Sequence, residues 1–244
     1  VLDYEDYDLH TVTNEALKIG DGKWLFTSDN YVYNDTLYYR FDVYFDGTNA
    51  QTAYMLGRYC GLRINECYGL KWSNIDIENG AITIDRQMQY QDGLIKLVPL
   101  KTRNARRVVY MSQKLKDYFI RLEAETKAHA VDLKAQRAQN CTYIYDVDGN
   151  KISSLELVNS LPNGKIQTVN SMKYHSRTIK TALKIDFKFH YLRHTYGTRL
   201  AELNTPTHIL CNQMGHASGK VTERYYLAVS QTGIDILVKN LNGV

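Results

Sequence analysis

The segment "MGHASGKVTERYY", residues 214–226, combines an imidazole with two adjacent phenols. Tyr225 and Tyr226 stand nine and ten residues after His216. On a helix, neighbouring side chains point about 100° apart, so at most one of the two tyrosines shares a site with His216. Such a tyrosine would be a candidate nucleophile. In a chain with 20 tyrosines, simple packing is the alternative.

The segment "HYLRHTYGTRLAEL", residues 190–203, has helical periodicity. One narrow arc is apolar and consists of Leu192, Tyr196, Leu200 and Leu203. The opposite face carries two imidazoles, a guanidinium and a glycine, at His190, Arg193, His194 and Gly197. Two interpretations are open: a solvated basic face, or a site in which the glycine permits close approach.

A second helix is expected immediately before His216. In "TPTHILCNQMGHAS", Thr205 can cap a helix that Pro206 begins and that runs to about Met214. Gly215 suits the left-handed position that ends such a helix. His216 then lies on a turn that fixes its direction, although a purely structural histidine is the alternative.

Two more charged residues stand at breaks in the pattern. Arg63 lies in "CGLRINE", where a helix restarts, and Glu66 could hold it while it still points outward. Lys101 opens the turn "KTRNA", which we expect at the tip of a basic hairpin between two strands. Each has an alternative as an exposed charge. Basic residues crowd into 101–107 and 173–194, which suggests a polyanionic partner, although a charge run is usually a solvated face.

Composition narrows the class of protein. The chain has 244 residues, a net charge of +4, 44% hydrophobic and 23% charged residues, as is ordinary for a globular protein. No apolar run approaches the roughly 18 residues of a membrane span, and the acidic N-terminus is unlike a signal peptide. We therefore expect a cytoplasmic protein without a membrane partner. The four cysteines form no C-x-x-C pair, so we expect reduced thiols, no metal site and no cofactor.

The elements that must position these residues are mostly helical. Helical spacing covers residues 49–72, with an interruption at Gly61, and 113–137, with Leu115, Tyr118, Phe119 and Leu122 inside. Residues 81–111 read as three short antiparallel strands with Pro99 near an edge. Residues 141–154 read as strand, Asp-Gly turn, strand. The predicted class is mainly α with a small antiparallel β-sheet (α+β).

Four blocks of the sequence carry a family resemblance. In order along the chain they are "GLRINECYGLKW", "LKTRNARRVVYM", "HYLRHTYGTRL" and "MGHASGKVTERYY". Together they resemble the catalytic domain of the tyrosine recombinases (phage-integrase family), with the signature R…K…H-x-x-R…H…Y. The similarity covers roughly residues 24–226 and is closest in style to the integrases of conjugative transposons and other integrative and conjugative elements.

The resemblance implies a site-specific recombinase that cleaves and rejoins DNA through a 3′-phosphotyrosyl intermediate, without metal or ATP. It implies six catalytic residues: Arg63, Lys101, His190, Arg193, His216 and Tyr225. Arg63 and Arg193 would clamp the phosphate, and His216 would add a donor. His190 would accept the proton of the nucleophile Tyr225. Lys101 would protonate the leaving 5′-oxygen.

The same resemblance implies double-stranded DNA as the partner, at the recombination sites of a mobile element. Further DNA contacts are expected at Arg103, Arg106, Arg107, Lys173, Arg177 and His194. For His194, Arg106 or Arg107, a supporting position behind the site is the alternative. A homo-oligomer on the DNA, a tetramer, is expected, together with accessory excision or DNA-bending proteins.

Three regions are expected. Residues 1–22 would be a connector from a missing N-terminal DNA-binding region, 23–230 the catalytic domain, and 231–244 a helical tail. The tail would dock on a neighbouring protomer, with packing on its own domain as the alternative. Two other functions remain open: a type IB topoisomerase, which uses much the same residues, and a non-catalytic DNA-binding relic.

Overall fold

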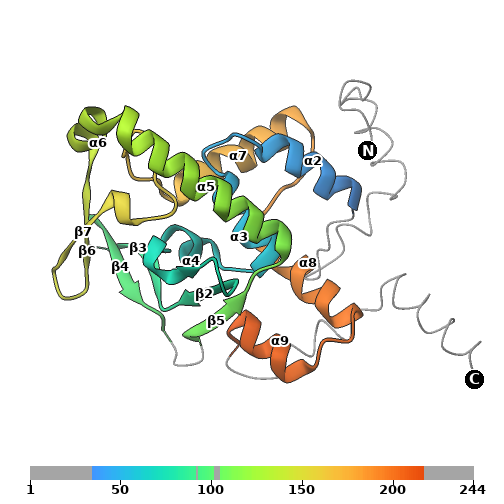
Figure 1. Cartoon of the computed structure of the whole chain (residues 1–244). Coiled ribbons are helices and arrows are strands. Elements are labelled where there is room, and N and C mark those ends of the chain that lie inside the picture. The colour runs from blue at the N-terminus through green and yellow to red at the C-terminus, as the bar shows by residue number, and fades with distance from the viewer. Residues whose placement is uncertain (1–34, 92, 102–104, 217–244) are drawn as a thin grey trace, which may run out of the picture.

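The computed structural model describes residues 35–91, 93–101 and 105–216. Their helices are α2 (Asp35–Phe45), α3 (Gln51–Cys60), α4 (Ile64–Tyr68), α5 (Gln113–Asp132), α6 (Lys134–Asn140), α7 (Val169–Ala182), α8 (Phe189–Glu202) and α9 (Thr207–Met214). Their strands are β1 (Ile75–Asp76), β2 (Ala81–Ile84), β3 (Arg86–Gln91), β4 (Leu94–Pro99), β5 (Arg107–Tyr110), β6 (Tyr143–Asp146) and β7 (Lys151–Ser153). The predicted mainly α class with little sheet is confirmed (Figure 1). Within the described residues, no helix is both long and apolar enough to cross a bilayer.

The strands form two small sheets where one was predicted. Strand order is β1-β2-β5 in the first and β3-β4-β6-β7 in the second. Residues 81–111 hold four strands, because Asp85 separates β2 from β3 and sends them to different sheets. Most pairs are antiparallel, but β4 and β6 run parallel. This pairing joins segments about 50 residues apart, which alternation within one segment cannot reveal.

The expected basic hairpin at Lys101 does not form. Among the described strands, β4 pairs with β3 and β6, whereas β5 pairs with β2. The "KTRNA" segment therefore connects two sheets. Lys101 is exposed at the start of this connection, and Pro99 ends β4, as its missing N–H favours.

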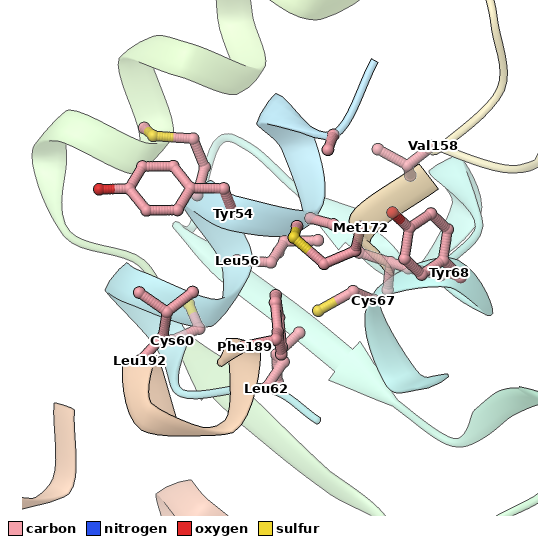
Figure 2. Packing of buried hydrophobic residues seen from close by; sticks show 14 of the residues in the cluster. Tyr54, Leu56, Cys60, Leu62, Cys67, Tyr68, Val158, Met172, Phe189 and Leu192 are labelled. Carbon is pink, nitrogen blue, oxygen red and sulfur yellow. The ribbon is translucent and has the colours of Figure 1, made fainter. Parts of the chain in front are cut away.

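The core joins α3, α4, α7 and α8 (Figure 2). Helices α3 and α8 approach closely at Gly57, where an added Cβ would lie 2.6 Å from the Phe189 ring. In this view Cys60 lies beside Leu192, and Leu62 lies beside Phe189. Helix α3 ends at Gly61 in the left-handed conformation, as the interruption in the pattern predicted, and α4 restarts after Arg63.

Two segments match their predicted form closely. The strands β6 and β7 pair antiparallel across the turn at Gly149, as predicted. The inner side of α5 buries Leu115, Tyr118 and Phe119. The predicted helix over 113–137 is nevertheless broken at Leu133, so that α6 begins a new direction.

Helices α8 and α9 depart from the prediction where they meet. Helix α9 begins at Thr207 with Pro206 as its N-cap, and Thr205 is not the cap. The Thr205 N–H instead bonds the carbonyl of Leu200, which closes the end of α8. Leu203 lies at this end and is 75% exposed, so the predicted apolar stripe stops one turn early.

The close contact at Gly61 yields a stability prediction. Its φ is +61°, and an added Cβ would lie 2.5 Å from Tyr196 Cδ1. Gly80 has φ +64° and open space around it. Gly80→Ala should cost about 1 kcal/mol from the left-handed backbone alone. Gly61→Ala should cost about 3 kcal/mol, because overlap with a packed ring is added.

Urea unfolding of both variants checks this difference. Equal losses at the two positions would mean that Tyr196 moves away without cost and that the α3–α8 contact is not tightly packed.

Candidate active site

Three arginines converge on the C-terminal end of α9. Arg107 Nε donates to the carbonyl of Gln213 at 3.0 Å, and Arg63 Nη2 donates to that of Gly215 at 3.3 Å. Arg193 Nη2 donates to the carbonyl between them, on Met214. Three successive carbonyls thus each accept from a different arginine. We call Arg63, Arg107 and Arg193 the arginine cluster.

The cluster occupies the negative end of a helix. The last carbonyls of a helix lack intrahelical partners, and the helix dipole favours cations there. Gly215 ends α9 with φ 62° and ψ 46°, as predicted. The His216 N–H then bonds the carbonyl of Cys211 at 3.1 Å. His216 is consequently fixed on the turn that the arginines surround.

One buried carboxylate serves two of these arginines. Glu66 Oε1 lies 2.9 Å from Arg63 Nη1, and Oε2 lies 2.9 Å from Arg107 Nη2. The Arg63 backbone N–H also donates to Glu66 Oε2, at the start of α4. Burial by itself would raise the pKa of Glu66, but Arg107 and then Arg63 hold it below its usual value. Glu66 therefore stays ionised and orients Arg63, as expected.

The three guanidiniums differ in exposure. The Arg63 side chain is 40% exposed, whereas that of Arg107 is wholly buried. Arg193 is 2% exposed and also donates to the Gly61 carbonyl at 2.6 Å, which ties α8 to the end of α3. The face of α8 is therefore buried at Arg193 and Gly197, whereas His190 on the same face is exposed. The whole face is thus not a solvated basic one.

Two histidines beside the cluster, His190 and His216, are held neutral. Burial, followed by the charges of the arginine cluster and of His194, lowers the pKa of His216 to about 3. Burial, then Arg193 and Arg63, lowers the pKa of His190 as well. The rings of His190 and His194 meet edge to face with centroids 4.5 Å apart. A neutral imidazole at the site can accept a proton or donate one N–H.

The remaining predicted residues fall in three groups. The first group is exposed and takes no part in the hydrogen bonds of the arginine cluster given above: Lys101, Arg106, and Lys173 and Arg177 on α7. His194 is half-buried beside His190. Arg103 and Tyr225 lie outside the described residues, as does Tyr226.

The position of Arg107 does not allow the DNA contact that was predicted for it. Its guanidinium is buried against Glu66, Gln213 and Ala105, so the supporting position is the one it occupies. The alternation in β5 carries this signal, since Arg107 shares the inward face with Val109. A charged residue on an inward face needs a buried partner, and sequence reasoning had not used this rule. Nor did it identify the carbonyls of Gly61, Gln213 and Met214 as acceptors.

These contacts bring Arg63, Arg107 and Arg193 together with Glu66 and His216 at the end of α9. The model of the phage integrase family matches residues 43–232 of the 244. The chain belongs to the phage integrase family.

Two curated proteins match most of this chain at about a quarter sequence identity. The XerC-like tyrosine recombinase of Caldanaerobacter subterraneus subsp. tengcongensis is 27% identical over 206 residues, covering 80% of this chain and 50% of that protein. The putative defective protein IntQ of Escherichia coli K12 is 24% identical over 185 residues, covering 72% and 44%. The chain thus spans about half the length of these relatives.

Solved structures share the fold. The Tn1549 transposon integrase in complex with circular intermediate DNA superimposes with a TM-score of 0.64 at 21% identity, covering 88% of this chain and 68% of that one. The XerA recombinase gives a TM-score of 0.59 at 16% identity, covering 88% and 66%. Both likenesses concern the fold alone.

The shared carboxylate predicts a large stability effect. Glu66→Gln leaves the buried Arg107 without a counter-charge, so we expect a loss of about 3 kcal/mol in the free energy of unfolding. The matched control is Glu156→Gln, at an exposed pair 3.3 Å from Lys71 Nζ. It should cost less than about 1 kcal/mol. Denaturant titration measures both, and similar values would argue against a structural role for the Glu66 charge.

The neutral His216 predicts a pH effect. In the unfolded chain a histidine titrates near about pH 6.5. Because the folded pKa is lowered to about 3, the unfolded chain binds more protons between these values. The free energy of unfolding therefore falls as the pH falls below about 6.5.

His216→Asn removes this contribution, so its free energy of unfolding should decline less between about pH 7 and pH 5. Urea titrations across this range give the two slopes. A variant with the same slope as the original chain would contradict the prediction.

Proposed function

We propose that this chain is the catalytic part of a site-specific recombinase that cleaves and rejoins DNA through a 3′-phosphotyrosyl intermediate. The observation that carries the proposal is the arginine cluster around His216, with neutral imidazoles beside it. Two of its arginines share one carboxylate, which leaves them with excess positive charge. A phosphodiester is an anion that guanidinium groups bind through paired donors.

Arg63 is the group best placed to meet the phosphate. Its side-chain hydrogen bonds to described residues use two of its N–H groups, and a guanidinium carries five. Its exposure leaves the others accessible. Arg193, which is buried next to this position, would also stabilise the charge of the phosphate, since negative charge builds on the non-bridging oxygens in the transition state. His216 would donate its neutral N–H.

The proton transfers follow from the states of the other groups. The Tyr225 hydroxyl, with an ordinary pKa of about 10, must lose its proton as it attacks. Neutral His190 would accept that proton while the Tyr225 oxygen–phosphorus bond forms. The phosphorus–O5′ bond breaks, and Lys101 would protonate the leaving oxygen. One phosphodiester replaces another, so the reverse step rejoins DNA without an added energy source.

The expected partner is duplex DNA at the ends and target of a mobile element, for integration and excision. The exposed Arg106, Lys173 and Arg177, together with Arg103, would contact its backbone. Support for the mobile-element role comes from the fold shared with a transposon integrase. The chain's curated relatives are bacterial, and in a bacterium a DNA substrate would place the protein in the cytoplasm. A tetramer on DNA, with the tail 231–244 docked between protomers, and accessory proteins complete the proposal.

The two alternative functions can be distinguished from a recombinase by their DNA products. A type IB topoisomerase relaxes one duplex, whereas a recombinase joins strands of two different duplexes. A non-catalytic relic forms no covalent product at all. The intact contacts of Arg63, Arg193 and Glu66 favour an active site over a relic.

The decisive prediction concerns the two tyrosines. With a duplex nicked near the cleavage site, the broken strand diffuses away and the covalent protein–DNA adduct accumulates. Tyr225→Phe should abolish the adduct, because the attacking oxygen is gone. Tyr226→Phe is the matched control and should retain most of it, since on the helix expected from the sequence its side chain would point about 100° away from that of Tyr225.

Denaturing gel electrophoresis with labelled DNA measures the adduct. The proposal fails if the unaltered chain forms no adduct on any recombination-site duplex, or if Tyr225→Phe forms it as well as Tyr226→Phe does. Transfer of the label to a second duplex separates a recombinase from a topoisomerase.

A further inference from the structure

Arg107 has a contact set unlike that of a surface arginine. Nη1 and Nη2 donate to the two oxygens of Glu66 at 3.1 and 2.9 Å. Nη1 also donates to the Ala105 carbonyl at 2.9 Å, and Nε donates to that of Gln213 at 3.0 Å. One rigid, planar group therefore joins α4, the approach to β5, and the end of α9.

Each contact leads to a different part of the site. The same two oxygens of Glu66 also accept hydrogen bonds from Arg63: Oε2 from its backbone N–H and Oε1 from its Nη1. Held from both sides, this carboxylate cannot rotate without breaking paired hydrogen bonds. Gln213 begins the run of carbonyls that ends at Gly215, next to His216. Ala105 is the last residue of the segment 101–105, which begins at Lys101.

The packing around Arg107 leaves no room for adjustment. An added Cβ on Gly215 would lie 2.9 Å from Arg107 Nη1 and 3.0 Å from its Cδ. The side chain of Arg107 is wholly buried, as is that of Glu66. The guanidinium is thus enclosed by the elements that it connects.

We infer that Arg107 is a positioning residue, which holds the Arg63 guanidinium and the His216 imidazole at the separation that a bound phosphodiester needs, without touching the DNA. The inference rests on the proposed cleavage reaction. Lysine keeps the charge but presents a single ammonium, which cannot reach both oxygens of Glu66 and two carbonyls in one plane. Arg107→Lys therefore loosens the geometry and keeps the charge.

The test separates rate from affinity. Arg107→Lys should lower the single-turnover rate of adduct formation at saturating nicked duplex by about 100-fold, as displacements near 1 Å do. Its dissociation constant for the duplex should barely change. The matched control is Arg137→Lys, a buried arginine on α6 whose Nη1 donates to the Pro162 carbonyl. This variant should keep the original rate.

A second measurement needs no cleavage. Inorganic phosphate is titrated into the DNA-free chain while the ring signals of His216 are followed by NMR, with His216→Asn to assign them. Arg107→Lys should bind phosphate at least about tenfold more weakly, because donors are displaced. Arg137→Lys should match the original chain. If the original chain forms no adduct, the proposed function has failed, and this titration alone decides the role of Arg107.

The outcomes are distinct. The inference is overturned if Arg107→Lys keeps the rate and phosphate affinity of Arg137→Lys, or if its whole effect lies in DNA affinity, as for a direct DNA contact. Should Arg107→Lys not fold by circular dichroism, Gly215→Ala replaces it, since the new Cβ displaces Arg107 and retains every donor. Gly80→Ala controls for its left-handed backbone.

Discussion

The C-terminal end of α9 is the constraint on which the site depends. A helix end exposes carbonyls that need donors, and here three arginines supply them from the start of α4, from β5 and from α8. The direction of His216 is consequently set by elements separated by about 150 residues along the chain. The close contacts of α3 with α8, at Gly57 and Gly61, belong to the same constraint because they place Arg193.

Gathering cations in this way has an electrostatic consequence. Glu66 is shared between Arg63 and Arg107, so it cannot neutralise both. Burial first, and then the charges of the arginines, lower the pKa values of His190 and His216, so both imidazoles remain neutral. An anion bound at Arg63 would offset this field and raise both pKa values, so its binding is linked to proton uptake. In the proposed reaction, binding of the phosphodiester would therefore make these imidazoles better proton acceptors.

The sequence predicted what is local and missed what is distant. Helix ends at Gly61 and Gly215, the turn at Gly149 and the inner face of α5 follow from residue types and spacing within one segment. The division into two sheets does not, because β2 and β5 pair across the β3–β4 hairpin and β4 pairs with β6 beyond α5 and α6. For the site, the predicted Arg63, Arg193 and His216 do lie together, whereas the burial of Arg107 depended on a partner 41 positions away.

The arginines of the cluster differ in exposure, and their proposed roles differ accordingly. A guanidinium that is wholly enclosed, such as that of Arg107, has its donors committed to protein acceptors and sets distances. The partly exposed Arg63 keeps N–H groups for a ligand, and its orientation is inherited from the enclosed one through Glu66. In the proposed function, recognition of the anion and rigidity of the recognising group would thus reside in different residues. A charge-preserving change is therefore not a function-preserving one at the buried position, since geometry rather than charge is what that position contributes.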